Sequence, residues 1–324
     1  MTNLEFNDLG VGVKIKNSER DILSNLNFEN CRYGIYFEDN ALNVFVEQFS
    51  MINMYLGVQI IAVSQRCEGL TFSNGLIWNS SYAVNMTEGR LIVFDKCIFE
   101  TLDYNTRIYG GLEVTIDDSW IHAEGDHIGV YISPQKAAID KVTIENTVFY
   151  RCGLWGVCAE YNAGYGNPKN VQLLYNKFDY DGKAGTSSGD IYFYAVRQAQ
   201  IIGNEFATTL VGQNIIKMES TNNNLMVLNN NFASSGAIAW GTETSRTVKN
   251  NIGYVTENSG TSTISASTAV TFNHGLAGTP TYVNVGFKTS GYGSWSWFAT
   301  STQISITVEN TGNYDLTWYA EYKP

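Results

Sequence analysis

A degenerate repeat of hydrophobic and polar positions runs through most of the chain. Each repeat is a short alternating apolar run, then Asn or Asp, then an apolar residue that we call the anchor, as in VTIDDSWIH (114–122) and VTIENTVFY (142–150). Alternation with a period of two predicts strands, and a repeat of about 22–29 residues is typical of solenoids and β-helices. The anchors are Phe49, Ile77, Phe99, Ile121, Phe149, Phe178, Phe206 and Phe232.

A second short strand is predicted after each anchor, for example in GIYFED (34–39), IGVYIS (128–133) and DIYFYA (190–195). The hairpin dipeptides that a meander needs do not recur at the strand junctions, so parallel coils stacked ~4.8 Å apart fit the pattern better. Alternation points these residues inward: Ile35, Val58, Val84, Val130, Val157, Ile191, Ile215 and Ile238. It turns the next residue of most of these strands outward: Tyr36, Gln59, Asn85, Tyr131, Cys158 and Tyr192.

The Asn or Asp that precedes an anchor is predicted to form a column along the solenoid. Short polar side chains of this kind tolerate the left-handed backbone region and bond their own turn. We therefore expect a structural role for the column and assign it no function. Its members are Asp118, Asn146, Asn176, Asn204 and Asn230.

The repeat fades near residue 255, where a Ser/Thr/Gly-rich stretch begins. We expect residues 1–20 to be a lead-in or cap, residues 21–255 to be the β-helix, and residues 256–324 to be a separate C-terminal β-domain. Five short alternating segments in this last part predict antiparallel strands in a sandwich-like arrangement. A domain of this size is marginal alone, so its expected role is to cap the solenoid or to hold a trimer together.

Composition narrows the function classes. The chain has 324 residues, 44% hydrophobic and only 16% charged, and its net charge of −11 argues against nucleic acid as a partner. No apolar run approaches the ~20 residues of a membrane span, and no signal-peptide core follows Met1, so we expect cytoplasmic synthesis and no membrane insertion. The five cysteines sit in strand-like segments without metal-binding spacing. We interpret them as buried core residues and expect no cofactor.

The repeat region resembles right-handed parallel β-helix proteins of the pectate-lyase type, and bacteriophage tailspikes in particular, through segments such as VTIENTVFYRCGLWGVCAEYN. The C-terminal run resembles a small β-domain found at the ends of phage tail fibres and tailspikes. The matching pieces there include His274-Gly275-Leu276, Thr279-Pro280 and Trp318-Tyr319-Ala320-Glu321. The resemblance implies an all-β fold in which a right-handed parallel β-helix is followed by a small antiparallel domain.

The resemblance also carries expectations about partners and location. It implies a homotrimer that forms part of a virion tail, contacts other tail components and binds a polysaccharide, such as capsule or O-antigen, at the outer surface of the host cell. The particle-attachment domain that such proteins usually carry at the N-terminus has no counterpart in this sequence. Either the chain is a fragment of a longer protein, or it docks through its first twenty residues or through another subunit.

Tyrosines on the outward face are the candidate sugar-binding residues. A ring with a polar tip can stack on a sugar while its hydroxyl bonds the sugar's hydroxyls. The alternative is that exposed strands favour Tyr for reasons of packing alone. The candidates are Tyr36, Tyr109, Tyr131, Tyr161, Tyr192 and Tyr194, of which Tyr36, Tyr109, Tyr131 and Tyr192 are expected at equivalent positions of different coils.

Glu160 is the first candidate catalytic residue, because alternation places it outward on the tyrosine face. Glycoside hydrolysis uses two carboxylates, ~5–5.5 Å apart when configuration is retained and ~6.5–9.5 Å apart when it is inverted. Strand geometry puts Asp190 roughly 14 Å from Glu160, which is long for a pair. Asp179, Asp181 or a carboxylate of a neighbouring chain are the other candidate partners, and a solvated acidic face is the alternative to catalysis.

A second group of acids, Asp95, Asp117 and Glu145, is expected at equivalent outward positions of three consecutive coils. Carboxylates ~4.8 Å apart could hold a hard cation such as Ca²⁺ or could splay into water. We assign no metal to this ladder.

These observations favour a tailspike-like protein that binds a host polysaccharide and depolymerises it by glycoside hydrolysis with paired carboxylates. A non-catalytic receptor-binding fibre, a purely structural tail component and a polysaccharide lyase remain alternatives. A lyase needs a basic residue to neutralise a uronate, and the tyrosine face is expected to lack one. Arg107 and Arg151 are the closest candidates.

Overall fold

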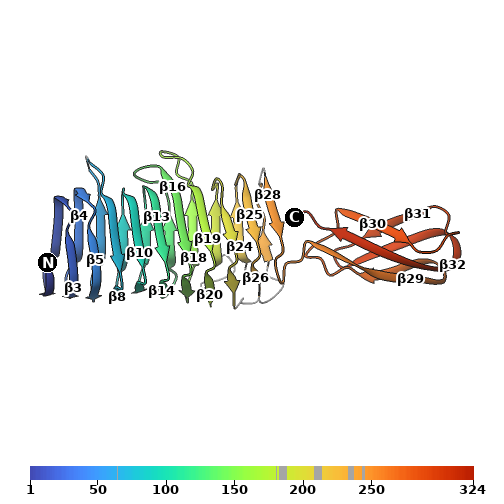
Figure 1. Ribbon diagram of the computed structural model, residues 1–324, viewed down its shortest axis with the longest axis horizontal. Coiled ribbons are helices and arrows are strands. Elements are labelled where there is room, and N and C mark those ends of the chain that lie inside the picture. The colour runs from blue at the N-terminus through green and yellow to red at the C-terminus, as the bar shows by residue number, and fades with distance from the viewer. Residues whose placement is uncertain (64, 180, 182–187, 208–213, 233–236, 243–244) are drawn as a thin grey trace. The chain divides into compact units, whose positions relative to one another are not determined.

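The computed structural model spans residues 1–324 and describes all of them except 64, 180, 182–187, 208–213, 233–236 and 243–244. Every regular element in the described part is a β-strand (Figure 1). The chain divides into two units, Met1–Thr247 and Val248–Pro324, so the boundary expected after residue 255 falls inside the second unit. No helix that could cross a lipid bilayer occurs among the described residues.

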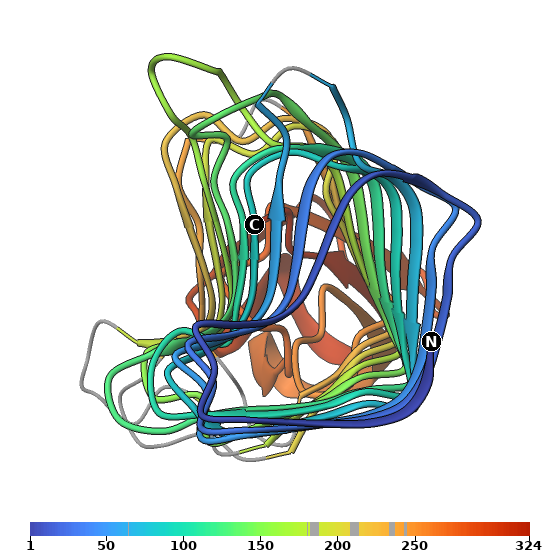
Figure 2. The ribbon, with the colours of Figure 1, turned by 90° about the vertical axis from the view of Figure 1, so that its left-hand side faces the viewer.

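The first unit is a parallel β-helix of about nine turns, as the repeat predicted. Its strands stack in three parallel sheets around a common interior (Figure 2). Sheet 1 contains β2 (Val11–Glu19), β4 (Tyr33–Leu42), β6 (Leu56–Ile61), β9 (Tyr82–Met86), β12 (Thr106–Ile108), β15 (Ile128–Ile132), β18 (Trp155–Glu160), β21 (Gly189–Tyr194), β24 (Asn214–Glu219) and β27 (Ala237–Ala239).

Sheets 2 and 3 carry the first strand of each repeat and its anchor, respectively. Sheet 2 contains β7 (Glu68–Ser73), β10 (Arg90–Asp95), β13 (Gly111–Asp117), β16 (Ile139–Glu145), β19 (Lys169–Leu174), β22 (Gln200–Ile202), β25 (Leu225–Leu228) and β28 (Arg246–Lys249). Sheet 3 contains β8 (Leu76–Ser80), β11 (Ile98–Thr101), β14 (Trp120–Ala123), β17 (Val148–Tyr150), β20 (Lys177–Asp179), β23 (Glu205–Phe206) and β26 (Asn231–Phe232).

The first coils are built differently, because sheets 2 and 3 are not yet separate there. Strands β1 (Thr2–Asn7), β3 (Ile22–Glu29) and β5 (Phe45–Ile52) pair in parallel along their length. The start of β5 then pairs with β7 and its end with β8. Residues 1–20, expected as a lead-in or cap, already form β1 and β2, and β2 pairs in parallel with β4.

The anchors form the centre of the core. Phe149, Phe178, Phe206 and Phe232 are buried and stack face to face, with ring centroids 4.8, 5.1 and 4.9 Å apart. Burying one such side chain stabilises the fold by about 1.5–3 kcal/mol. The stack repeats at the spacing of the coils, so each new coil extends a column that is already in place.

One anchor was assigned to the wrong residue. The register places Met51, and not Phe49, opposite Ile77. Phe49 is also buried, but its ring lies over Gly75, where a Cβ atom would come within 2.0 Å of it. Both side chains of β5 point inward because they are two positions apart, and alternation alone cannot tell which of them meets the next anchor.

The polar column before the anchors is really two adjacent columns. Asp118 and Asn146 have φ of 46° and 49° and occupy the left-handed corner, as expected. Asn176, Asn204 and Asn230 follow that corner by one residue and are buried in a hydrogen-bonded ladder. Asn204 Nδ2 donates to Asn230 Oδ1 at 3.0 Å, and Asn204 Oδ1 accepts from Asn176 Nδ2 at 3.1 Å. Both columns are structural.

The remaining core confirms two predictions and corrects one. All five cysteines are free and buried. The inward residues of sheet 1 lie in register from Val13 to Ile191. In the following coil Ile216, and not Ile215, lies opposite Ile191. Ile215 and Ile216 are both buried, so their hydrophobicity gave no sign of the slip.

The second unit is a small antiparallel sheet of β29 (Glu257–Asn273), β30 (Tyr282–Phe287), β31 (Trp295–Ala299) and β32 (Gln303–Glu321). Strand β32 pairs with all three others. The sheet therefore has four strands where five were expected, because two of the expected segments merge into β32. The Ser/Thr/Gly-rich stretch forms the first half of β29, and its Ile264 is buried in the core of this unit.

Candidate functional site

The outward residues of sheet 1 form a column along the solenoid, which we call the tyrosine column. Parallel pairing places these residues in register: Lys14, Tyr36, Gln59, Asn85, Arg107, Tyr131, Cys158, Tyr192 and Lys217. Tyr109 was expected in this column, but Arg107 occupies the position between Asn85 and Tyr131. Tyr109 comes just after β12, and its ring lies edge-on to that of Tyr131 with centroids 6.1 Å apart.

Cations also stand in this column, contrary to the expectation that the face lacks them. Lys14, Arg107 and Lys217 occupy it at three different coils. Cys158 is buried, since the ring of Trp155 stacks on that of Tyr192 across it, with centroids 5.2 Å apart. The column is therefore mixed, with tyrosines and cations rather than tyrosines alone.

A second outward column runs beside the first. Glu160, Tyr194 and Glu219 lie in register on β18, β21 and β24, and we call them the carboxylate column. Tyr194 is exposed between the two acids, and Tyr161 is exposed directly after Glu160. Glu219 was missed in the sequence because the segment NIIKME was aligned on Ile215. With Ile216 pointing inward, Glu219 at the end of this segment lies in register with Tyr194 and Glu160.

Each acid of the carboxylate column is held by a tyrosine of the tyrosine column. The Tyr131 hydroxyl donates to Glu160 Oε2 at 2.8 Å, and the Tyr192 hydroxyl donates to Glu219 Oε2 at 2.8 Å. Burial, reinforced by the neighbouring carboxylate, raises the pKa of both tyrosines, so they stay protonated and act as donors. The same Tyr–Glu pair thus occurs twice.

Lys217 distinguishes the two pairs. Its Nζ lies 2.6 Å from Glu219 Oε1, and this contact, with the hydrogen bond from Tyr192, lowers the pKa of Glu219 below its ordinary value. No cation of the described residues forms an ion pair with Glu160. Glu219 is therefore held as a carboxylate, while Glu160 has only a neutral donor beside it.

The spacing of the two acids suits a carboxylate pair. One coil separates each from Tyr194, so their backbones lie about 9–10 Å apart at the usual distance between neighbouring strands. Inverting glycosidases hold their carboxyl groups ~6.5–9.5 Å apart, which leaves room for a water molecule. Each carboxyl group bonds a tyrosine of the preceding coil, so the two side chains lean the same way and keep about the backbone spacing, at the upper end of this range.

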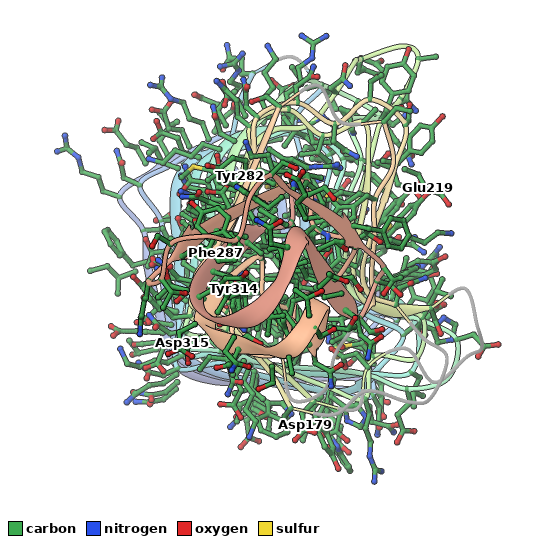
Figure 3. The ribbon with its side chains drawn as sticks, turned by 90° about the vertical axis from the view of Figure 1, so that its right-hand side faces the viewer. Asp179, Glu219, Tyr282, Phe287, Tyr314 and Asp315 are labelled. Carbon is green, nitrogen blue, oxygen red and sulfur yellow. The ribbon has the colours of Figure 1, made fainter. Side chains whose placement is uncertain are left out.

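The other acids named from the sequence do not lie on this surface. Asp179 ends β20 opposite Tyr150 on sheet 3, and it projects from a different side of the solenoid than Glu219 (Figure 3). Asp181 and Asp190 are only 3% exposed. Burial raises the pKa of both well above the ordinary value, and the charge of Asp181 adds to the effect on Asp190. Asp181 Oδ1 accepts from the Cys152 backbone N–H at 2.7 Å.

A second row of tyrosines lies beside the tyrosine column and was missed in the sequence. It consists of Tyr33, Tyr55, Tyr82 and Tyr104. Ring centroids are 6.3 Å apart for Tyr33 and Tyr55, and 5.6 Å apart for Tyr55 and Tyr82. The guanidinium of Arg107 continues the row, 4.3 Å from the Tyr82 ring and 4.2 Å from the Tyr104 ring. The spacing of these tyrosines follows the solenoid repeat, which is the signal that could have revealed them.

The acidic ladder on sheet 2 has the expected register but is already engaged. Asp95, Asp117 and Glu145 lie opposite one another in successive coils. Lys96 Nζ lies 3.2 Å from Asp95 Oδ2, and Asn146 Nδ2 donates to Asp117 Oδ1 at 2.9 Å. In the part of the chain that the structure describes, no cluster of His, Cys, Asp and Glu has the arrangement of a metal site.

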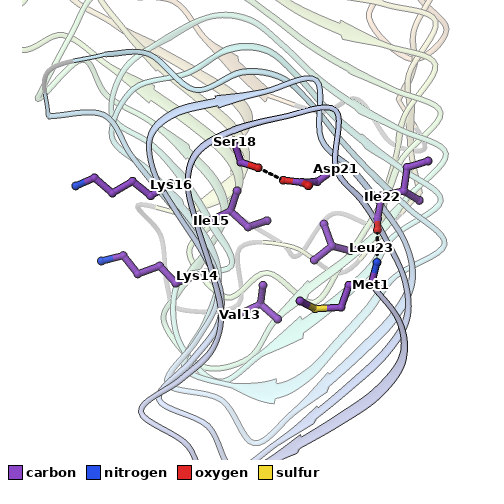
Figure 4. A pocket seen from close by; sticks show the side chains of 9 residues that line it. All are labelled: Met1, Val13, Lys14, Ile15, Lys16, Ser18, Asp21, Ile22 and Leu23. Carbon is purple, nitrogen blue, oxygen red and sulfur yellow. Dashed lines mark hydrogen bonds between the residues drawn. The ribbon is translucent and has the colours of Figure 1, made fainter.

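Two hollows of the first unit lie away from the two acids, and one of them borders Lys14 of the tyrosine column. One is enclosed by the first coil, where Val13, Ile15 and Leu23 line it and the Ser18 hydroxyl donates to Asp21 (Figure 4). The other is lined by residues that include His122 and Arg151. Neither contains Glu160, Glu219 or a member of the second tyrosine row.

No protein-family model and no curated protein sequence matches the chain. Solved structures that are similar to the chain include phage tailspikes. A tailspike mutant of Escherichia coli bacteriophage HK620, in complex with a pentasaccharide, matches 97% of this chain and 71% of its own at 11% identity, with a TM-score of 0.49.

Two further solved structures are also similar to the chain. The tailspike gp49 of Acinetobacter baumannii bacteriophage Fri1, a capsular polysaccharide depolymerase, matches 96% of this chain and 79% of its own at 12% identity, with a TM-score of 0.37. The surface protein and adhesin PfbA of Streptococcus pneumoniae matches 75% of this chain and 83% of its own at 12% identity, with a TM-score of 0.32. Such matches concern the fold alone and assign no role to any residue of this chain.

Proposed function

We propose that this protein is a tailspike-like, polysaccharide-binding protein that holds a glycan along sheet 1 and cleaves it by glycoside hydrolysis between Glu160 and Glu219. The observation that carries the proposal is the repeated Tyr–Glu pair, Tyr131 with Glu160 and Tyr192 with Glu219, on one exposed face two coils apart. Aromatic rings with polar tips line the same face, which suits the stacking of sugar rings.

The two acids have different surroundings, which assigns their roles in the proposal. Glu219 is kept ionised by Lys217 and Tyr192, so it suits the general base that activates a water molecule. Glu160 has no cationic partner among the described residues and suits the general acid that protonates the leaving oxygen. Tyr194 lies between them in register and is placed to contact the sugar at the cleavage point.

Substitution of each acid by its amide tests the proposal. Glu160→Gln and Glu219→Gln should each lower kcat for polysaccharide cleavage by about 10²–10⁴-fold while leaving binding largely intact. Glu145→Gln, on sheet 2, is the matched control and should cleave at the normal rate. The measurement is the size distribution of capsule or lipopolysaccharide fragments over time. If both amide variants still shorten the polymer at the normal rate, this pair is not catalytic.

Asp190→Asn and Asp179→Asn separate the present pair from the other acids named from the sequence. Activity lost in either of these variants, with Glu219→Gln active, would move the catalytic pair to the interior or to sheet 3. A protein that binds polymer without ever shortening it would be a non-catalytic fibre, and one without either property a structural tail component.

A polysaccharide lyase is the second candidate, and the place of Arg107 in the tyrosine column favours it. A basic residue at that position could neutralise a uronate before a proton is removed from it. A lyase leaves an unsaturated sugar at the new chain end, whereas a hydrolase adds the elements of water. Mass spectrometry of the fragments therefore decides between the two reactions.

The assembly is also part of the proposal. By analogy with tailspikes we infer a homotrimer in a virion tail, in contact with other tail components and active at the outer surface of the host, with the second unit as its trimerisation or capping domain. Light scattering of the whole chain tests the trimer. A monomeric mass at micromolar concentration would contradict it.

A further inference from the structure

We propose that the polysaccharide bound along sheet 1 is anionic, and that Arg107, with Tyr82, Tyr104 and Asn85 around it, binds the carboxylate of an acidic sugar. This inference rests on the proposed function and names the chemical class of the ligand. It assigns a binding site two coils from Glu160 along the same face.

Arg107 is a partly buried cation that lacks an anion. No carboxylate of the described residues lies within ion-pair distance of its guanidinium, and its Nε is buried without a hydrogen-bond partner. Asp103, close by in the chain, is engaged by other groups: it accepts a hydrogen bond from Tyr82, and its Oδ1 accepts from the Tyr104 backbone N–H at 2.9 Å and lies 3.3 Å from His127 Nδ1. Leaving a buried charged donor unpaired costs free energy, which an anionic ligand would recover.

The guanidinium is held in a fixed position between two rings. Its centre lies 4.3 Å from the Tyr82 ring and 4.2 Å from the Tyr104 ring, and the Tyr104 ring lies 6.2 Å from that of Tyr131. A guanidinium held in this way presents a planar fork of donors, which fits the two oxygens of a carboxylate. The flanking rings offer the flat apolar surface on which a sugar can stack.

A neighbouring acceptor completes the site. Asn85 lies opposite Arg107 in register, and its Oδ1 is buried without a hydrogen-bond partner in the described part of the chain. Its Nδ2 is occupied, since it donates to Gln59 Oε1 at 3.0 Å. The residues that carry this unpaired donor and this unpaired acceptor are therefore neighbours in register. An acidic sugar carries the complement of both, a carboxylate for Arg107 and a hydroxyl for Asn85.

Polysaccharide binding with and without the carboxylate tests the inference. The wild-type chain is screened at low salt on an array of acidic and neutral bacterial capsular polysaccharides and lipopolysaccharides. Each polymer that binds is then measured again after chemical reduction of its carboxyl groups to alcohols. The polymers that bind should be acidic, and reduction should weaken binding at least about tenfold. The affinity for the acidic polymer should also fall as salt is raised.

Variants show whether Arg107 is the group that reads the carboxylate. Arg107→Gln should lose about as much affinity for the acidic polymer as reduction causes, and should lose nothing further on the reduced polymer. Arg107→Lys, which keeps the charge, should recover part of the affinity. Arg151→Gln is the matched control, because Arg151 also lies over a tyrosine ring, 5.0 Å from that of Tyr150, but follows β17 of sheet 3. It should bind like wild type.

The outcomes separate this inference from the function on which it rests. Tight binding of a neutral polymer, or equal binding of the native and the reduced form, would overturn the role of Arg107 and leave polysaccharide binding in place. Absence of binding to every polymer would sink both. If Arg107→Gln does not fold, the comparison of native and reduced polymer with the wild-type chain still decides.

Discussion

Two columns of polar side chains run along the same solenoid and differ in how completely their hydrogen bonds are made. In the interior, Asn176, Asn204 and Asn230 repeat one residue type, and the side-chain oxygen and nitrogen of Asn204 are both fully bonded. On the outside of sheet 1 the residue type changes from coil to coil, and Arg107 Nε and Asn85 Oδ1 have no hydrogen-bond partner among the described residues. A repeated, satisfied column stabilises the stack, whereas a varied, unsatisfied one has bonding capacity left for a ligand.

The largest effect on stability is expected from the phenylalanine stack beside the interior ladder. Phe178→Ala should lower the free energy of unfolding by about 3–5 kcal/mol, because it removes a fully buried ring that contacts Phe149 and Phe206 and leaves a cavity. Glycan affinity at temperatures where the variant is folded should not change. Thermal unfolding followed by circular dichroism measures the loss. If Phe178→Ala changed glycan affinity but not the free energy of unfolding, the interior would not have the purely structural role assigned to it.

The ladder itself should give the next largest effect. Asn204→Ala removes the acceptor of the Asn176 backbone N–H and the donor to the Leu173 carbonyl, at 2.9 Å each, so buried groups lose their partners. A cost of about 2–4 kcal/mol in the free energy of unfolding is expected. Asn231→Ala, at the next and exposed position, serves as the control and should change stability little. Comparable losses in the two variants would show that the ladder adds nothing beyond an ordinary surface asparagine.

The fold could be predicted from the sequence much further than the site. A period of two with evenly spaced anchors defines stacked parallel strands, because each coil must bury the same face. Register was harder. Ile215 and Ile216 are both apolar and both buried, so alternation could be aligned on either, and a slip of one residue moves Glu219 from the interior to the carboxylate column.

Two further misses have the same physical origin. Strand β12 has only three residues and puts Thr106 inward, where its neighbours have Val, so its pattern was too short to show that Arg107 faces outward. Asp181 and Asp190 would be expected at the surface, because aspartates are rarely buried without a partner. The alternation of β20 and β21 does not predict the burial of either acid.

Substitution of a buried acid should raise the stability of the protein, whereas the two substitutions above should lower it. Burial first, and then the charge of Asp181, raises the pKa of Asp190 above its unfolded value near ~4. A raised acid pKa means that the folded state binds the proton more tightly than the unfolded state. The contribution of Asp190 to stability is therefore most favourable below about pH 4 and becomes less favourable as the pH rises toward the pKa of the folded state. Asp190→Asn should remove this loss of stability and therefore raise the free energy of unfolding at pH 7.

Unfolding midpoints of wild type and Asp190→Asn between pH 4 and 8 check that prediction, with Glu145→Gln, on the outer face of sheet 2, as a control. The two curves should meet at low pH and separate as the pH rises. Parallel curves would mean that Asp190 does not titrate in this range. The contrast in pKa between the buried Asp190 and the carboxylate column would then disappear. In that column the contact with Lys217 lowers the pKa of Glu219.

The smallest effect concerns that outer pair and tests its chemistry rather than its fold. Because the Lys217 contact is the largest influence that lowers the pKa of Glu219, Lys217→Gln should raise that pKa. If Glu219 acts as the base, it must be ionised, so the acidic limb of the kcat profile should move to higher pH. Tyr192→Phe removes the second hydrogen bond to Glu219 and should move the limb the same way by less. Tyr36→Phe, whose ring lies in the same column far from Glu219, should leave the limb in place. An acidic limb that stays fixed in all three variants would assign the base to another group, while the interior column would keep its purely structural role.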